Sequence, residues 1–207
     1  PLQERFEQAF DAVTLIDNDA NLIALGEATF GVGAGRQHLA YLHLSSGVGG
    51  GLVLNGRLYH GATSTAGEIG HAVVGHGWDG TGRPETLEEL VSISGLLRRA
   101  ARYGLDTDNL EQIFGDSAAG KRGGTELIDL VATRCAQIVA LIDPEMIVLG
   151  GVVIRIGGEP FVKAIADKVN DFIAPQFARP LPVVASILGP DSVTAGAIAD
   201  ALDSLSD

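Results

Sequence analysis

A run of glycines between two apolar segments constrains the fold of this chain more than any other feature. The apolar run Leu39 to Leu44 leads into Ser45-Ser46-Gly47-Val48-Gly49-Gly50-Gly51, and a second run, Leu52 to Leu54, leads to the turn dipeptide Asn55-Gly56. This pattern predicts two strands joined by a glycine loop, followed by a second tight hairpin into residues 57–59. Glycines leave backbone N–H groups uncovered, so the loop can wrap an anion such as phosphate. An isolated glycine loop is more often an empty hairpin, so the neighbouring motifs must decide.

A second polar motif follows the hairpin. Residues 63–70 are small and polar, and they lead into Ala66-Gly67-Glu68-Ile69-Gly70-His71. Glu68 and His71 would share a face in a helical turn. A carboxylate and an imidazole on one face can hold neighbouring sugar hydroxyls, and an ordinary surface pair is the alternative.

A third polar motif precedes the hairpin. Residues 12–16 are apolar and predict a short buried strand, which delivers Asp17-Asn18-Asp19-Ala20-Asn21 to the start of a helix. Aspartate and asparagine cap helix N-termini, but capping explains only one of these polar residues. We therefore expect some of them to face a ligand.

Composition excludes several classes of protein. Apolar residues make up 46% of the chain, which excludes a disordered polymer, and the formal net charge of −12 argues against a broad nucleic-acid-binding face within these residues. The single cysteine, Cys135, cannot form an internal disulfide and is expected to be buried. No apolar run approaches the ~18 residues of a membrane span and no signal peptide opens the chain, so we expect a soluble, cytoplasmic protein with no membrane partner.

The remaining periodicity predicts an α/β domain: a three-strand antiparallel start, then alternating helices and parallel strands. Expected helices cover residues 2–10, 22–28, 84–103, 125–142, 159–173 and 193–202, with a short one near residues 110–114. Expected later strands cover residues 146–149 and 183–188, and turns or loops are expected at residues 73–83 and 120–124. A domain boundary is expected between about Ala28 and His38.

In this order and spacing, Asn18-Asp19-Ala20-Asn21, Ser46 to Gly51 and Ala66 to His71 resemble the ROK family (repressor, ORF, kinase) of bacterial sugar kinases and sugar-responsive transcriptional regulators. Asp143-Pro144-Glu145 with Ile147 to Gly151 is similar to the C-terminal nucleotide-side strand of that family. The resemblance implies the actin-like ATPase, or ribonuclease H-like, fold. It also implies that residues 1–30 are the end of an N-terminal lobe and a hinge, and that residues 31–207 are the C-terminal lobe.

The resemblance assigns roles to particular residues. Asp19 matches the catalytic aspartate, the general base on the attacking sugar hydroxyl in a kinase. The implied sugar-binding residues are Asn18, Asp19, Glu68, His71 and, less securely matched, Glu88. The implied nucleotide-binding residues are Ser46, Gly47, Gly49 and Gly50 on the phosphate side, and Gly150 and Gly151, with the region after Gly189, on the adenosine side.

Three departures from the family pattern qualify these roles. The family's C-x-C-G-x-x-G-C zinc motif is absent, because no cysteine lies between His71 and Glu88, so we expect no structural zinc and no metal site. His76, Asp79 and Glu85 are a poor replacement set on a glycine-rich loop. Ser45 stands where the family has glycine, and residues 1–38 contain no first phosphate loop.

Two functions follow from the resemblance. The first is a sugar-sensing transcriptional regulator, expected to be a homodimer or higher oligomer, whose DNA-binding part lies outside this chain. The alternative is an ATP-dependent, glucokinase-like sugar kinase that uses ATP and magnesium, with this chain inactive by itself. A third hypothesis is a degenerate domain that binds no sugar and serves only for dimerisation. The sequence does not identify the sugar.

Overall fold

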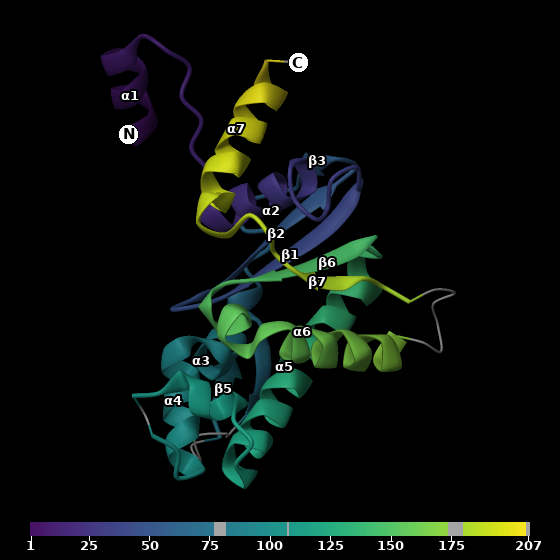
Figure 1. The fold of residues 1–207 in the computed structure, drawn as a ribbon. Helices are drawn as coiled ribbons and strands as arrows, with labels where there is room; N and C mark the ends of the chain where they lie inside the picture. Colours follow the sequence, from purple (N-terminus) through teal and green to yellow (C-terminus); the bar gives the residue numbers. More distant parts are fainter. Residues whose placement is uncertain (77–81, 107, 174–179, 206–207) are drawn as a thin grey trace.

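The computed structural model describes residues 1–76, 82–106, 108–173 and 180–205. Its centre is a mixed five-stranded sheet with the strand order β3-β2-β1-β6-β7 (Figure 1). The strands are β1 (His38–Leu44), β2 (Val48–Leu54), β3 (Arg57–Leu58), β6 (Met146–Gly150) and β7 (Val183–Ala185). The first three pair antiparallel as hairpins, and β1, β6 and β7 run parallel. The predicted antiparallel start followed by parallel crossovers is confirmed.

The second hairpin forms because its turn residues tolerate left-handed backbone. Asn55 and Gly56 have φ angles of 55° and 75°, and Leu54 pairs with Arg57 across them. Asn-Gly is the preferred dipeptide for this two-residue turn, whose twist matches that of the strands. The first hairpin is thereby continued into β3, and Gly49 to Gly51 lie within β2 instead of a loop.

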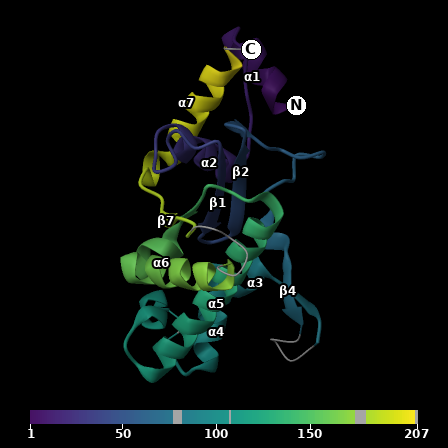
Figure 2. The ribbon, with the colours of Figure 1, turned by 90° about the vertical axis from the view of Figure 1, so that its right-hand side faces the viewer.

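Helices cover both faces of the sheet (Figures 1 and 2). The described helices are α1 (Leu2–Phe10), α2 (Asp19–Thr29), α3 (Leu87–Val91), α4 (Ile93–Arg102), α5 (Ala118–Ile142), α6 (Val152–Ile173) and α7 (Ser192–Ser204), of which α1 lies apart from the sheet. On one face α2 packs against β1 and β2 and carries α7, while α6 packs on the other face and is backed by α5. Both faces of the central strands are therefore buried, which explains why β1 and β6 are apolar without alternation.

The contact between α2 and α7 depends on glycines. A Cβ on Gly196 would lie 1.7 Å from the Leu22 carbonyl oxygen, and a Cβ on Gly26 would lie 2.9 Å from the Gly196 nitrogen. The two helix backbones therefore touch directly, which requires glycine at the crossing. The first turn of α2 also lies against the glycine hairpin, where a Cβ on Gly49 would lie 3.3 Å from Ala20 Cβ.

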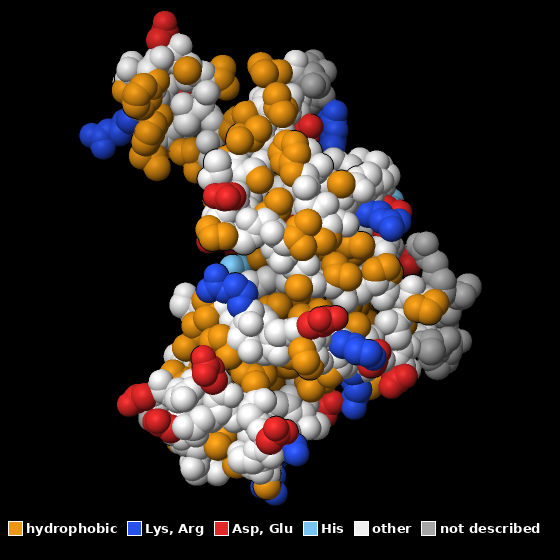
Figure 3. Space-filling model, viewed as in Figure 1, with side chains coloured by type: hydrophobic (Ala, Val, Ile, Leu, Met, Phe, Trp, Pro, Cys, Tyr) orange, Lys and Arg blue, Asp and Glu red, His pale blue; other side chains and the backbone are white. Residues whose placement is uncertain are grey.

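The predicted strand at residues 12–16 is wrong. This segment is irregular, and Val13, Leu15 and Ile16 are 86%, 45% and 55% exposed. A strand needs a neighbour for its backbone hydrogen bonds, and none of the described strands lies beside this one. Apolar side chains of α1 also lie on the surface (Figure 3).

Two features around α3 and α4 differ from the predicted single helix over residues 84–103. Thr86 and Glu89 form a capping box at the start of α3. Strand β5 (Pro84–Thr86) pairs with β4 (Val73–His76) before this helix begins, where the sequence predicted loop and helix. The helix expected over residues 84–103 is also interrupted, because extended Ser92 caps α4 through its hydroxyl.

Three more boundaries lie closer to the N-terminus than predicted. The turn predicted at residues 120–124 is wrong, because the Ser117 hydroxyl accepts the Gly120 N–H at 3.0 Å and starts α5 at Ala118. Helix α6 begins at Val152, before the predicted Glu159, and a kink at Gly158 (φ 65°) joins its two parts. Strand β7 ends at Ala185, three residues before the predicted Leu188.

Candidate functional site

Two adjoining cavities lie where the parallel strands end. Strands β1, β6 and β7 all finish at one edge of the sheet, which is where α/β sheets commonly bind ligands. The larger cavity has a volume of about 650 Å³ and the smaller one about 290 Å³. Figure 3 shows a notch on this side of the surface, with a histidine and a cationic side chain at its rim.

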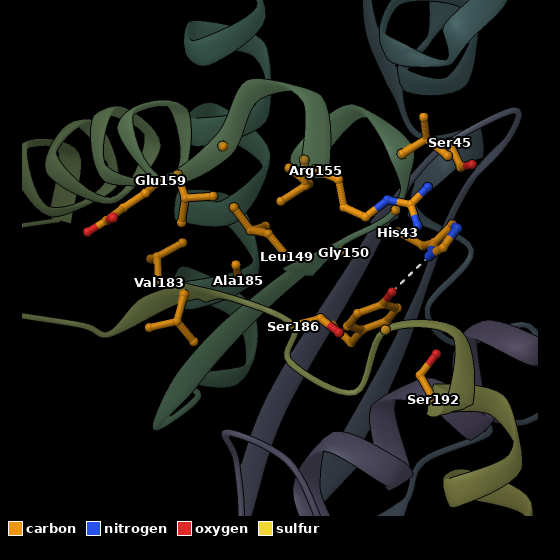
Figure 4. Close-up of a pocket in the computed structure, with 18 of the residues that line it drawn as sticks. His43, Ser45, Leu149, Gly150, Arg155, Glu159, Val183, Ala185, Ser186 and Ser192 are labelled. Carbon is orange, nitrogen blue, oxygen red and sulfur yellow. Dashed lines mark hydrogen bonds between the residues drawn. The ribbon is translucent and has the colours of Figure 1, made fainter.

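The larger cavity is mostly apolar (Figure 4). Leu149 and Gly150 come from the end of β6, and Ala185 and Ser186 from the end of β7. Helix α6 contributes three charged side chains to the lining, Arg155, Glu159 and Lys163. Gly189 and Ser192, at the start of the last helical segment, complete the wall. An apolar cleft of this size with a few charged groups at its edge suits a nucleoside carrying phosphates.

The Gly150-Gly151 pair lines this cavity, as the adenosine-side prediction requires, but packing also demands these glycines. A Cβ on Gly150 would lie 2.2 Å from the Tyr41 hydroxyl oxygen, and one on Gly151 would lie 2.2 Å from the Leu44 carbonyl oxygen. Gly151 also has a φ of 96°. The pair is therefore required by the fold whether or not a ligand binds.

The smaller cavity gathers most of the residues predicted to bind a sugar and phosphate. Asn18 and Asp19 from the start of α2, Glu68 and Glu88 line it together with the glycine hairpin. The hairpin contributes Ser46, Gly47, Gly49 and Gly50. Segments separated by as many as 70 positions thus meet, as Asn18 and Glu88 show. Carboxylates and an amide around one small cavity can accept and donate hydrogen bonds to a polyol.

The Glu88 carboxylate accepts a hydrogen bond from one of the backbone N–H groups of the glycine hairpin. Its Oε2 accepts the Val48 N–H at 2.9 Å, across the turn in which the Ser45 N–H donates to the Gly47 carbonyl at 2.9 Å. The hairpin therefore already holds one anion, a carboxylate of its own chain. Two of its glycines serve packing, because a Cβ on Gly51 would lie 2.6 Å from Ala24 Cβ and one on Gly50 would lie 2.8 Å from the Gly67 carbonyl.

The turn that carries Asn18 and Asp19 is held by hydrogen bonds. Asn18 caps α2 by accepting the Ala20 N–H at 2.8 Å. Asp17 Oδ1 accepts the Asn18 N–H at 2.7 Å and the Asn21 side-chain amide at 2.8 Å, and its Oδ2 lies 2.6 Å from His60 Nε2. Burial raises the pKa of Asp17, but the hydrogen bonds from Asn21, His60 and the Asn18 N–H outweigh it and leave the pKa below its ordinary value. Asp17 therefore stays ionised and orders the turn.

His71 is not brought into the smaller cavity. Its side chain is 76% exposed, and its Nε2 lies 3.8 Å from Glu68 Oε2. His71 lines a third cavity of about 450 Å³, between the Glu68 loop and the end of α5. Glu68 borders both this cavity and the smaller one.

Glu27 is a positioning residue that the sequence reading missed. It is fully buried on α2, where its Oε1 accepts from the Ser186 hydroxyl at 2.5 Å and from the N–H groups of Ile187 and Leu188. Its Oε2 accepts the Val32 N–H at 3.0 Å. Glu27 thus ties α2 to the turn after β7 that walls the larger cavity. The only sequence signal was a glutamate within an apolar helix.

His43 was missed as well. It lies at the end of β1 and lines both cavities, and its Nδ1 is 2.7 Å from the Tyr41 hydroxyl oxygen. Burial lowers the pKa of His43, while the Asp19 charge opposes the shift. The sequence signal was a histidine in an otherwise apolar strand.

Neither a metal cluster nor a membrane helix is present in the described part of the chain. No three His, Cys, Asp or Glu side chains among those residues are grouped so as to hold a metal ion, and Asp79 and the His76 side chain lie outside the description. Within the same residues, every helix is too short or too polar to cross a bilayer.

Comparison with known proteins gives a consistent result. The ROK family model matches residues 1–203. The glucokinase of Halalkalibacterium halodurans is 30% identical over 217 residues, which cover 95% of this chain and 66% of that protein. The xylose repressor of Caldicellulosiruptor bescii is 30% identical over 220 residues, which cover 96% of this chain and 54% of that protein.

Among solved structures, the ROK hexokinase from Thermus thermophilus superposes with a TM-score of 0.87 at 29% identity, covering 100% of this chain and 71% of that one. The fold is therefore the expected actin-like ATPase fold. The chain spans about two thirds of the length of the glucokinase and about half that of the repressor. Both kinases and regulators are among the relatives, and the family model and these relatives show that this chain belongs to the ROK family.

Proposed function

We propose that the natural protein carrying this chain is an ATP-dependent sugar kinase, with the sugar in the smaller cavity and ATP in the larger one. The observation that carries the proposal is that the two cavities adjoin through shared residues, His43 and Ser45, and that Asp19 lines the smaller one. A phosphoryl donor and an acceptor hydroxyl held in adjoining cavities can react in line.

Asp19 is assigned as the general base. It would take the proton of the sugar hydroxyl as that oxygen attacks the γ-phosphorus. Asn18, Glu68 and Glu88 would hold the other hydroxyls. His71 as a sugar ligand and Ser46 to Gly50 as phosphate ligands remain predictions. His71 lies beside Glu68 and is largely exposed, and the hairpin N–H of Val48 is engaged by Glu88.

Phosphoryl transfer also uses Mg²⁺, which bridges phosphate oxygens and neutralises their charge. The carboxylates around the smaller cavity are suitable ligands by type. Because no ready-made group of metal ligands exists among the described side chains, the nucleotide phosphates and water would supply most of the coordination.

The division of the chain at about residue 30 is also a proposal. The exposed apolar side chains of residues 13–16 suit pairing with strands of an N-terminal lobe, which would complete the cleft. Phosphorylation is therefore assigned to the natural full-length protein.

A sugar-responsive regulator is the second candidate. The observation that favours it is Ser45 at the junction of the cavities, a residue larger than the glycine of the family pattern, together with the similarity to a xylose repressor. In this case sugar binding would shift the protein between DNA-binding states without turnover.

The experiment is ADP release by the full-length protein with Mg-ATP and a panel that includes glucose, xylose and N-acetylmannosamine. The kinase reading predicts turnover with at least one sugar. Asp19→Asn should lower kcat by about 10³-fold with little change in sugar affinity, because only proton abstraction is lost. Asp203→Asn, on the exposed end of α7, is the matched control and should change nothing. Sugar binding without turnover would refute the kinase and favour the regulator.

A further inference from the structure

His43 has a position that a purely structural histidine would not need. Of the described residues that line the larger and the smaller cavity, only His43 and Ser45 line both. Both lie at the carboxyl end of β1, where the strand leaves the sheet and enters the hairpin. A group at this junction faces the path between a donor in one cavity and an acceptor in the other.

The hydrogen bond to Tyr41 orients the imidazole. Tyr41 is only 2% exposed, and its hydroxyl oxygen lies 2.7 Å from His43 Nδ1 (Figure 4). Burial, together with the Glu27 and Asp19 charges, raises the pKa of Tyr41, so the phenol keeps its proton. Which of the two atoms donates depends on the imidazole tautomer, and we assign the phenol as the donor to Nδ1. The neutral imidazole then carries its own proton on Nε2, on the far side of the ring.

Two charged groups face this ring. Asp19 approaches from the start of α2 and raises the pKa of His43, while Arg155 approaches from α6 and, with burial, lowers it. Figure 4 shows the Arg155 side chain extending from α6 toward His43, with Ser45 close by. Three kinds of donor thus lie at or beside the junction, an imidazole N–H, a guanidinium in the lining of the larger cavity and a hydroxyl, and the Asp19 carboxylate lines the smaller cavity. Such a donor set suits the oxygens of a transferring phosphoryl group.

We propose that His43 is a catalytic residue that donates its Nε2–H to a non-bridging oxygen of the terminal phosphate, with Ser45 and Arg155 as the accompanying donors. This inference rests on the proposed kinase function. In the step, the sugar oxygen forms a bond to the γ-phosphorus, the bond from that phosphorus to the β–γ bridging oxygen breaks, and its electron pair leaves with ADP. The hydroxyl proton goes to Asp19, and His43 neither gains nor loses a proton.

A pair of substitutions separates the two nitrogens of the ring. In His43→Asn the side-chain amide can replace Nδ1 opposite Tyr41 but offers no donor at Nε2. In His43→Gln the amide nitrogen reaches approximately the Nε2 position. Removal of one donor to a developing charge costs about 10²-fold or more in kcat. A structural role for His43 would instead be satisfied by the asparagine.

The measurements are kcat, sugar dissociation constants, and the affinities of Mg-ATP and adenosine for the full-length protein and both variants. We expect His43→Asn to lower kcat by about 10²-fold and to weaken Mg-ATP but not adenosine or sugar, and His43→Gln to recover most of the loss. Unchanged kcat in His43→Asn would overturn the inference and leave the kinase assignment standing. If the wild-type protein has no turnover, the kinase assignment fails, and the Mg-ATP to adenosine comparison still decides whether His43 contacts phosphate.

Discussion

The two cavities share one edge of the sheet, but different kinds of residue line them. The larger cavity is walled by aliphatic side chains, glycines and the turn after β7, and its shape follows from how strands end and helices cross. The smaller cavity is walled by three carboxylates, an amide and the hairpin backbone. We therefore expect the larger cavity to recognise its ligand by shape and the smaller cavity to recognise its ligand by hydrogen bonds.

The largest effect is expected from Glu27, which holds the wall of the larger cavity. Glu27→Ala would remove the shared acceptor of the partly buried N–H groups of Ile187, Leu188 and Val32 and of the Ser186 hydroxyl, and it would leave a cavity at the fully buried Glu27 position. We expect a loss of about 3 to 5 kcal/mol in the free energy of unfolding. Urea denaturation of the full-length protein measures it. Glu4→Ala, on the exposed face of α1, should stay within about 0.5 kcal/mol of wild type. An equally small effect of Glu27→Ala would show that Glu27 does not hold the wall of the larger cavity.

The next effect concerns the shape of the larger cavity. An indole at position 185 would fill space at the end of β7, so Ala185→Trp should weaken nucleotide binding by about 100-fold and leave sugar binding unchanged. Isothermal titration calorimetry with an ATP analogue and with the sugar measures both constants. Ala197→Trp, exposed on α7 away from the cavity, serves as control. Loss of sugar binding in Ala185→Trp would show that the two cavities are not separate in function.

A smaller effect is expected from the carboxylates. Glu88→Gln should weaken sugar binding by about 10-fold, because hydrogen bonds to a charged acceptor are stronger by about that factor than those to a neutral one. The matched control is Glu159→Gln, the same change made in the lining of the larger cavity. If both variants lose sugar affinity equally, the loss comes from a general effect of charge and not from a hydrogen bond between Glu88 and the sugar.

The smallest effect concerns pH. The pKa of His43 is below its ordinary value in the folded protein, so protonation of His43 favours unfolding. The stability contributed by neutral His43 is complete above the unfolded pKa, about 6.5, and is lost as the pH falls through the lower folded pKa. Melting curves from pH 7.5 to 5 should show this acid-side loss, and His43→Gln should reduce it. Identical pH profiles for the two proteins would contradict the assignment of a neutral, buried imidazole.

The same contrast explains how much the sequence could predict. Residues of the smaller cavity come in short polar motifs, Asn18-Asp19, Ser46 to Gly50 and Glu68, whose chemistry is readable without a structure. The larger cavity was predicted only through Gly150-Gly151 and the region after Gly189, because aliphatic lining residues look like any core residues. Glu27 and His43 matter through partners 159 and two positions away, respectively, and such pairings appear only once the chain is folded.

The fold followed the same rule. Strong periodicity and turn chemistry located β1 to β3, β6 and the central part of α5. The errors lay where an apolar run had no strand to pair with, at residues 12–16, and where a serine cap decided a helix boundary, at Ser92 and Ser117. The first error depends on contacts that the local sequence does not contain. The second concerns a local signal, because each serine hydroxyl accepts the N–H three residues further along the chain.

The most direct test of the central claim is a crystal structure of the full-length protein with its sugar and a non-hydrolysable ATP analogue. We expect the sugar to lie beside Asp19 in the smaller cavity, with a hydroxyl within about 3.2 Å of the Asp19 carboxylate. We expect the nucleoside to lie in the larger cavity and the terminal phosphate at the junction between His43 and Ser45. A sugar bound with the larger cavity closed to nucleotide, or a nucleotide whose phosphates point away from this junction, would contradict the central claim.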